Sequence, residues 1–102
     1  MLVEFNTLPD YSKVWIYQSN RRFTIDELEL VTNKTKLFLE QWAAHGTGLK
    51  AGFEIKYERF IVIAVNQDEQ SATGCSIDSS VRFIQELEKE LDIELLDKMN
   101  VA

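Results

Sequence analysis

FEIKYERFIVIAV, residues 53–65, is the stretch that decides the fold of this chain. In its first half Phe53, Ile55 and Tyr57 alternate with charged residues, as in a strand with one face in water. Its second half, residues 60–65, is apolar throughout, which is typical of a central strand buried on both faces. One strand over the whole stretch would span roughly 43 Å, whereas a compact domain of this length is about 33 Å across. The stretch therefore predicts two strands joined by a turn at Glu58-Arg59.

The helix predicted before this hairpin has the clearest start signal in the chain. Thr24 is placed as N-cap and Glu27 as the third helical residue, which together form a capping box. Phe23 and Leu28 have the spacing of a hydrophobic staple. Apolar residues at helical spacing follow, so we expect a helix that ends at about Ala44.

The remaining elements complete an alternating order of strands and helices. Lys13–Gln18 predicts the first strand, and a helix is expected from Ile77 or Asp78 to Leu91. Residues Ile93–Leu96 are predicted to form a short last strand. Residues 1–12 are predicted to form an N-terminal arm. The order βαββαβ matches the ferredoxin-like sandwich. We therefore expect a single α+β domain over residues 1–102, with an antiparallel sheet and two helices on one face.

Composition excludes several classes of function. The net charge of −6 disfavours a phosphate backbone as partner, so no nucleic acid is expected. Cys75 is the only cysteine, which rules out an internal disulfide and fits a reducing cytoplasm. No secretory signal, membrane-length apolar run, metal-ligand spacing or cofactor motif occurs. The glycine-rich segment 46–52 follows a helix and precedes a strand, which is the reverse of a dinucleotide loop.

The segment with the most chemical promise is the predicted start of the second helix. Cys75 is the candidate nucleophile, because the positive end of a helix dipole lowers a thiol pKa. Free amides there also bind anions. The alternative is that serine and aspartate simply cap the helix and that the cysteine is buried. The candidate ligand-binding residues are Gly74, Cys75, Ser76, Asp78 and Ser79.

His45, the only histidine, is a second candidate for chemistry. It would serve as a base if the end of the first helix met the start of the second. The competing interpretation is a histidine that interacts with the last carbonyls of the first helix. The sequence leaves both open.

Uncovered apolar surface is the main indication of a binding role. Two helices cover only one face of a sheet, yet the strands carry apolar residues on both faces. Trp15 and Tyr17 are the candidate interaction surface, and the open face should meet the arm, a C-terminal segment, a protein partner or a second copy. The expected function is a binding or assembly module without catalysis. The alternatives are a thiol-dependent or redox-responsive protein using Cys75, and a small-anion-binding regulatory domain.

Three stretches resemble a family of uncharacterised small bacterial proteins: Trp15–Thr24, the helix through Gln41-Trp42, and Asn66–Val81 with its Gly74-Cys-Ser-Ile-Asp78. The similarity covers most of the chain. Some members carry the label ABC-transporter ATPase, which the motifs here do not support because no phosphate loop is present. The resemblance implies that related chains continue past the equivalent of Ala102. It brings no established catalytic residues.

Overall fold

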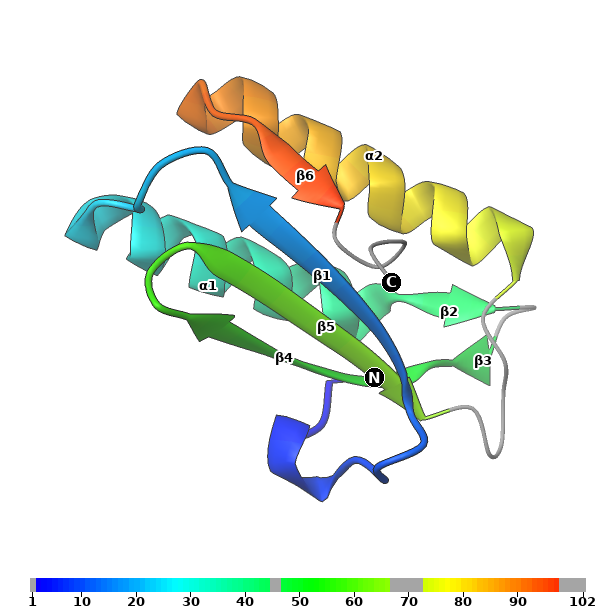
Figure 1. Cartoon of the computed structure of the whole chain (residues 1–102). Helices are drawn as coiled ribbons and strands as arrows, with labels where there is room; N and C mark the ends of the chain where they lie inside the picture. Colours follow the sequence, from blue (N-terminus) through cyan, green and yellow to red (C-terminus); the bar gives the residue numbers. More distant parts are fainter. Residues whose placement is uncertain (1, 45–46, 67–72, 98–102) are drawn as a thin grey trace.

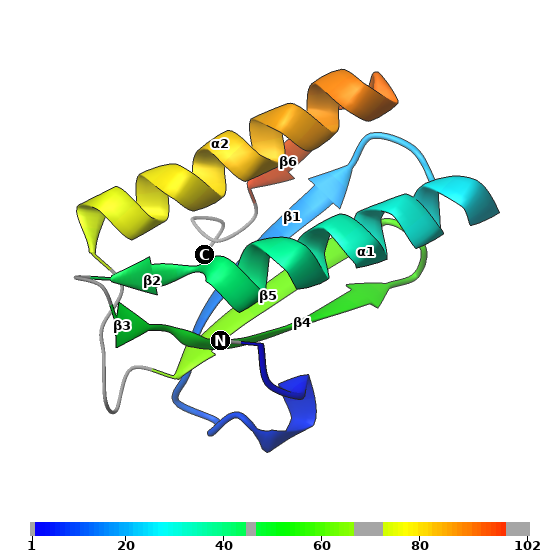
Figure 2. The same ribbon diagram turned by 180° about the vertical axis from the view of Figure 1, so that it is seen from behind.

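The protein is an α+β fold in which two helices pack on one face of an antiparallel sheet (Figures 1 and 2). The computed structural model describes residues 2–44, 47–66 and 73–97. The sheet has the order β4-β5-β1-β6, and each neighbouring pair is antiparallel. The strands are β1 (Lys13–Ser19), β4 (Lys50–Lys56), β5 (Phe60–Asn66) and β6 (Leu95–Asp97).

The centre of the sheet is the pair β1 and β5, as the apolar run predicts. Residues 61–65 are all buried, so β5 is covered on both faces. Trp15 lies opposite Ile63 in the register, and Tyr17 lies opposite Ile61. Partners in an antiparallel register point to the same face. Both pairs belong to the core beneath the helices.

The turn between β4 and β5 has an unusual backbone. Tyr57 and Glu58 adopt positive φ values of 56° and 55°, a conformation that glycine and asparagine usually supply in such hairpins. The Phe23 amide donates to the Glu58 carbonyl at 2.8 Å, and the Ser19 amide donates to the Arg59 carbonyl at 2.8 Å. These bonds hold the turn against the loop that leads into the first helix. Tyr57, predicted as part of the strand, is instead an exposed residue of the turn.

The first helix, α1 (Ile25–Gln41), confirms the predicted start but not the predicted end. The Glu27 amide donates to Thr24 Oγ1, and the Glu27 carboxylate accepts from the Thr24 amide, which completes the capping box. The helix ends at Gln41 because Trp42 is extended. The next residues form β2 (Ala43–Ala44), which pairs with β3 (Thr47–Gly48). His45 and Gly46 lie outside the described residues.

The second helix, α2 (Gly74–Leu91), starts three or four residues before the predicted Ile77 or Asp78 and ends at Leu91 as expected. Asp92 follows in the left-handed conformation that commonly ends a helix. The last strand begins at Leu95 rather than Ile93, because the Ile93 amide still donates to the Glu88 carbonyl of α2 at 3.1 Å and its side chain is buried in the core. Val81, expected on the inner stripe, is 42% exposed.

The N-terminal arm runs along the edge strand β4. It contains one turn of 3-10 helix, η1 (Phe5–Thr7), and the Val3 amide donates to the Ala51 carbonyl at 2.9 Å. Ala51 points into the core, so Gly52 points to the opposite face. A side chain at Gly52 would lie 2.8 Å from the Val3 carbonyl oxygen. The arm therefore covers the helix-free face of the sheet at this position.

Candidate functional site

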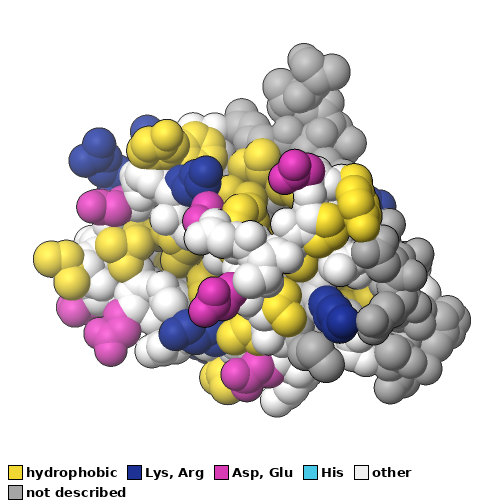
Figure 3. Space-filling view, turned by 90° about the horizontal axis from the view of Figure 1, so that it is seen from below, with side chains coloured by type: hydrophobic (Ala, Val, Ile, Leu, Met, Phe, Trp, Pro, Cys, Tyr) yellow, Lys and Arg dark blue, Asp and Glu magenta, His cyan; other side chains and the backbone are white. Residues whose placement is uncertain are grey.

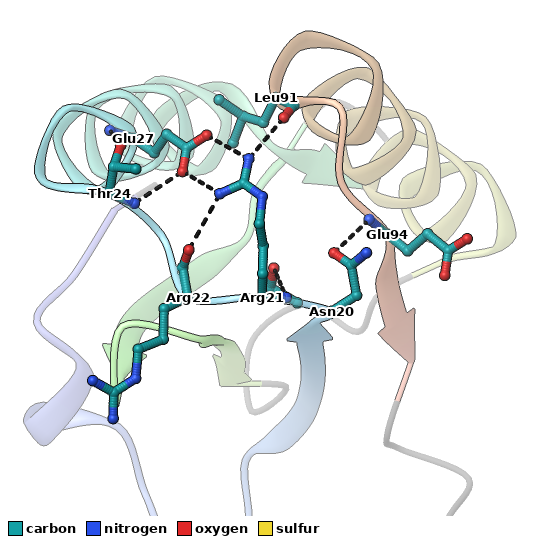
Figure 4. A network of polar contacts seen from close by, with 8 residues as sticks. Asn20, Arg21, Arg22, Thr24, Glu27, Leu91 and Glu94 are labelled. Atoms are coloured by element: carbon teal, nitrogen blue, oxygen red, sulfur yellow. Dashed lines mark hydrogen bonds and ion pairs between the residues drawn. The ribbon is translucent and has the colours of Figure 1, made fainter.

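The two helices lie antiparallel and are tied together at both ends. Arg21, ahead of α1, donates to the carbonyl of Leu91 at the end of α2 at 3.1 Å (Figure 4). At the other end, the indole nitrogen of Trp42 donates to the Ser76 carbonyl at 2.8 Å in a buried contact. The end of α1 thus meets the start of α2. The sequence alone did not determine whether these two helix ends would meet.

Arg21 also forms a two-pronged ion pair with Glu27. Its two terminal nitrogens donate to the two carboxylate oxygens at 2.6 and 2.8 Å. This bond and the amide of Thr24 lower the pKa of Glu27 from an ordinary value near 4.5 to about 2. Figure 4 shows that the guanidinium of Arg22 points away from this network. The cluster serves structure, since it connects the start of α1 to the end of α2.

A groove of about 400 Å³ separates the outer surfaces of α1 and α2, and we refer to it as the interhelical groove. Its floor is the ring pair Phe38 and Phe83, which stack at 4.6 Å with an angle of 3° between their planes. An ion pair between Lys34 and Glu90, 2.8 Å long, connects the two helices near one end. The groove is lined by Lys34, Leu37, Phe38, Gln41, Ser79, Arg82, Phe83 and Glu86.

The opposite end of the groove continues toward the ends of the helices that Trp42 joins. A second hollow of about 290 Å³ shares Phe38, Gln41 and Ser79 with the first and adds Trp42 and Ala43. The two hollows thus follow the helix pair over much of its length. Their shared floor is aromatic, whereas their edges carry amide, hydroxyl and charged groups, as in many surfaces that bind protein segments.

The rim of the interhelical groove carries groups that the fold does not use. Leu37 on α1 is 59% exposed although it is a large apolar side chain. Arg82 and Glu86 on α2 line the groove one helical turn apart. Neither forms an ion pair with another described residue, unlike Lys34 at the end of the groove.

The predicted ligand-binding residues do lie together, but most serve the helix start. Thr73, which is not among the predicted site residues, is the N-cap of α2 and forms a capping box with Ser76. Ser76 Oγ accepts from the Thr73 amide at 2.7 Å and donates to the Thr73 carbonyl at 2.9 Å. Ser79 Oγ donates to the Cys75 carbonyl at 3.1 Å. The two serines are therefore used locally, and Ser76 is buried.

Cys75 lies at the second position of α2 with its thiol exposed, as predicted. Gly74 and Asp78 are also exposed, and no other described residue forms a hydrogen bond or ion pair with the side chain of Cys75 or of Asp78. His45 lies outside the described residues, so its predicted pairing with Cys75 is not described. The arrangement offers an accessible thiol beside a helix start, with no positioned base among the described residues.

The prediction of Trp15 and Tyr17 as an interaction surface is wrong. Each is only 6% exposed and lies under the helices, and the Trp15 ring meets Trp42 edge-on at 5.9 Å. On the helix-free face, Val62 and Ala64 are also buried. The large apolar residues that are exposed lie on the arm, the helices and the hairpin turn instead: Tyr11, Ile25, Leu37, Tyr57 and Val81.

Sequence reasoning missed the groove, although Leu37 offered a signal. It is an apolar residue outside the stripe that α1 turns to the core, and it is not part of the core that the described residues form. Arg82 and Glu86 gave no such signal, because charged residues on the surface of a helix are ordinary.

The side of the molecule seen from below in Figure 3 carries apolar side chains interspersed with acidic and basic ones, so it shows no broad patch of one kind.

Neither a metal centre nor a membrane span emerges from the described residues. They contain no group of three or more His, Cys, Asp or Glu side chains placed to hold a metal ion. Within the same residues, no helix is both long and apolar enough to cross a bilayer. Comparison with known proteins adds no identity, because no family model, no curated protein and no solved structure matches the chain.

Proposed function

We propose that this protein is a binding or assembly module without catalysis, and that its partner contacts the interhelical groove. The observation that carries the proposal is the exposed Leu37 beside the stacked rings of Phe38 and Phe83. Exposed apolar groups next to a formed concave surface are typical of protein-binding sites. The groove also lies on two helices joined at both ends, so its shape is set before a partner arrives.

The proposal extends to fold class and setting. We assign the architecture to the ferredoxin-like sandwich, with β2 and β3 as an additional hairpin. The strand order β4-β5-β1-β6, with one helix after β1 and one after β5, supports this assignment. We retain a cytoplasmic location, which the single thiol favours. The similarity to small uncharacterised bacterial proteins is retained as a proposal, and the ATPase label is not.

Cys75 supports a second candidate function, a thiol-dependent enzyme or redox-responsive protein. Its exposure at the second position of an 18-residue helix is the specific observation in favour. Against it, Ser76 and Ser79 make hydrogen bonds within the helix start and do not position a base. The same use of Ser76 weakens the proposal of a small-anion site, because its amide already donates to Thr73 Oγ1.

The rate at which Cys75 reacts with 5,5′-dithiobis(2-nitrobenzoate) at pH 7 separates these functions. We expect a rate within about tenfold of that of glutathione, because an exposed thiol without a positioned base keeps ordinary nucleophilicity. Since Cys75 is the only cysteine, the signal has one source, and Cys75→Ser supplies the blank. A rate more than about a hundredfold above glutathione would favour the thiol function.

A further inference from the structure

We infer that the partner in the interhelical groove is a second copy of this chain, bound about a two-fold axis. The inference rests on the proposed function and adds the identity of the partner. A two-fold interface uses the same patch on both subunits, so the patch must be complementary to itself. The interhelical groove has this property in both shape and charge.

The shape argument concerns Leu37 and the ring floor. Each copy carries an exposed leucine on α1 beside a hollow whose base is Phe38 and Phe83. When two copies face each other, the leucine of one lies over the rings of the other, and the arrangement repeats across the axis. A groove of about 400 Å³ accepts such a side chain. Both exposed leucines then leave water together.

The charge argument concerns Arg82 and Glu86. They are four residues apart on α2, so they lie on the same side of the helix. They do not pair with each other, which agrees with the weaker pairing when the basic residue precedes the acidic one. Two antiparallel copies of α2 place Arg82 of each against Glu86 of the other. The order of the two charges along α2 is reversed in the second copy, so Arg82 and Glu86 of each copy each meet a residue of opposite charge.

The size of the surface indicates a weak dimer. Helices of this length are about 25 Å long and lie about 10 Å apart, which gives a two-helix face on the order of 500 Å² per copy. The total of roughly 1,000 Å² is at the lower limit for a specific interface. We therefore expect association that depends on protein concentration.

Sedimentation equilibrium over a concentration series tests the inference. The wild-type mass should rise from 11.8 kDa toward twice that value. Leu37→Glu should stay monomeric, because it places a charge over the rings of the other copy. Val81→Glu is the matched control, since Val81 is exposed on α2 but does not line the groove. It should associate like the wild type.

Charge reversal gives the sharper test. A dimer of Arg82→Glu chains would place two glutamate–glutamate contacts across the axis, and a dimer of Glu86→Arg chains would place two arginine–arginine contacts there. Each variant should therefore be monomeric when it is alone. An equal mixture of the two variants restores both opposite-charge pairs and should associate again. Circular dichroism and thermal unfolding check that every variant is folded. A wild-type monomer at several hundred micromolar, or a mixture that fails to associate when the wild type does, overturns the inference.

A dimer that persists in all these variants also overturns it and would place the interface elsewhere. The proposed function is tested separately, because the thiol reactivity of Cys75 does not depend on this interface. An unreactive thiol in a monomeric protein would leave the binding function with a different partner.

Discussion

At the scale of single residues, the most informative side chain is Thr35 in the middle of α1. It is fully buried, and its hydroxyl has no hydrogen-bond partner among the residues that the structure describes. An unsatisfied buried hydroxyl costs about 1–3 kcal/mol. Valine has nearly the same shape without the hydroxyl, so Thr35→Val should raise the free energy of unfolding by about 1 kcal/mol. Urea denaturation followed by circular dichroism measures the change.

Two variants serve as controls for this prediction. Thr35→Ser keeps the hydroxyl and removes a methyl group from the core, so it should lower the free energy of unfolding by about 1 kcal/mol. Thr32→Val lies in the same helix at a half-buried position and should stay within about 0.5 kcal/mol of the wild type. A destabilised Thr35→Val protein would mean that the hydroxyl has a partner in solution.

Residue-scale prediction from sequence succeeded where the signal was local and unique. Thr24 and Glu27 form the expected capping box because both residue types and their spacing are specific to a helix start. At α2, Ser76 was only one of several possible caps, and the cap is Thr73. Its third helical residue is Ser76 in place of the usual glutamate. The glycine and cysteine that follow Thr73 also gave no sign that the helix had begun.

At the scale of elements, two glycines with different surroundings provide a matched pair of substitutions. Gly52→Ala should destabilise the fold strongly, because its Cβ would lie 2.8 Å from the Val3 carbonyl oxygen and 2.9 Å from Phe5 Cα. Gly74→Ala should be neutral or stabilising by up to about 1 kcal/mol, because a Cβ there meets nothing and alanine favours the helix. Thermal unfolding of both variants measures the difference.

Deletion of the N-terminal arm shows whether contact with the arm causes the destabilisation by Gly52→Ala. If the Gly52→Ala cost comes from the arm, deleting residues 1–9 from the variant and from the wild type should give two proteins of nearly equal stability. A cost that remains after the deletion would instead arise within β4 and contradict the proposed close approach.

The orientation of the sheet shows why sequence alone could not locate the site. Both β1 and β5 carry apolar residues on both faces, so either face was a plausible core. Trp15 faces the helices because its ring packs against Trp42, a contact between residues distant in sequence. Once that face is inside, the exposed apolar residues must be sought elsewhere, and Leu37 becomes the relevant one.

At the scale of the whole molecule, the Arg21 network links pH to stability. The pKa of Glu27 is about 2 in the folded protein, below an ordinary value near 4.5. Its ionised form is therefore favoured by folding, and this stabilisation is complete above about pH 4.5 and is lost as the pH falls toward 2. The difference in stability between the wild type and Glu27→Gln should thus be constant near neutral pH and shrink in acid.

Chemical denaturation at a series of pH values between 2 and 7 measures this difference. Glutamine can still complete a capping box, so the substitution removes mainly the charge that Arg21 binds. Glu29→Gln, on an exposed position of the same helix, should follow the wild-type profile. A Glu27→Gln protein whose stability runs parallel to the wild type down to pH 2 would show that the ion pair is absent in solution.

The central position of β1 in the sheet affects how the chain folds while the ribosome synthesises it. Both of its neighbours in the sheet, β5 and β6, are encoded later than α1. Roughly 45 residues separate the end of β1 from the end of β5, and synthesis at about 5–20 residues per second makes this a wait of about 2–9 s. During that interval the nascent chain carries Trp15 and Tyr17 without their later strand partners. A strand with two unpaired edges is open to pairing with other chains, so we expect the translation rate between Ser19 and Asn66 to affect the yield of folded protein.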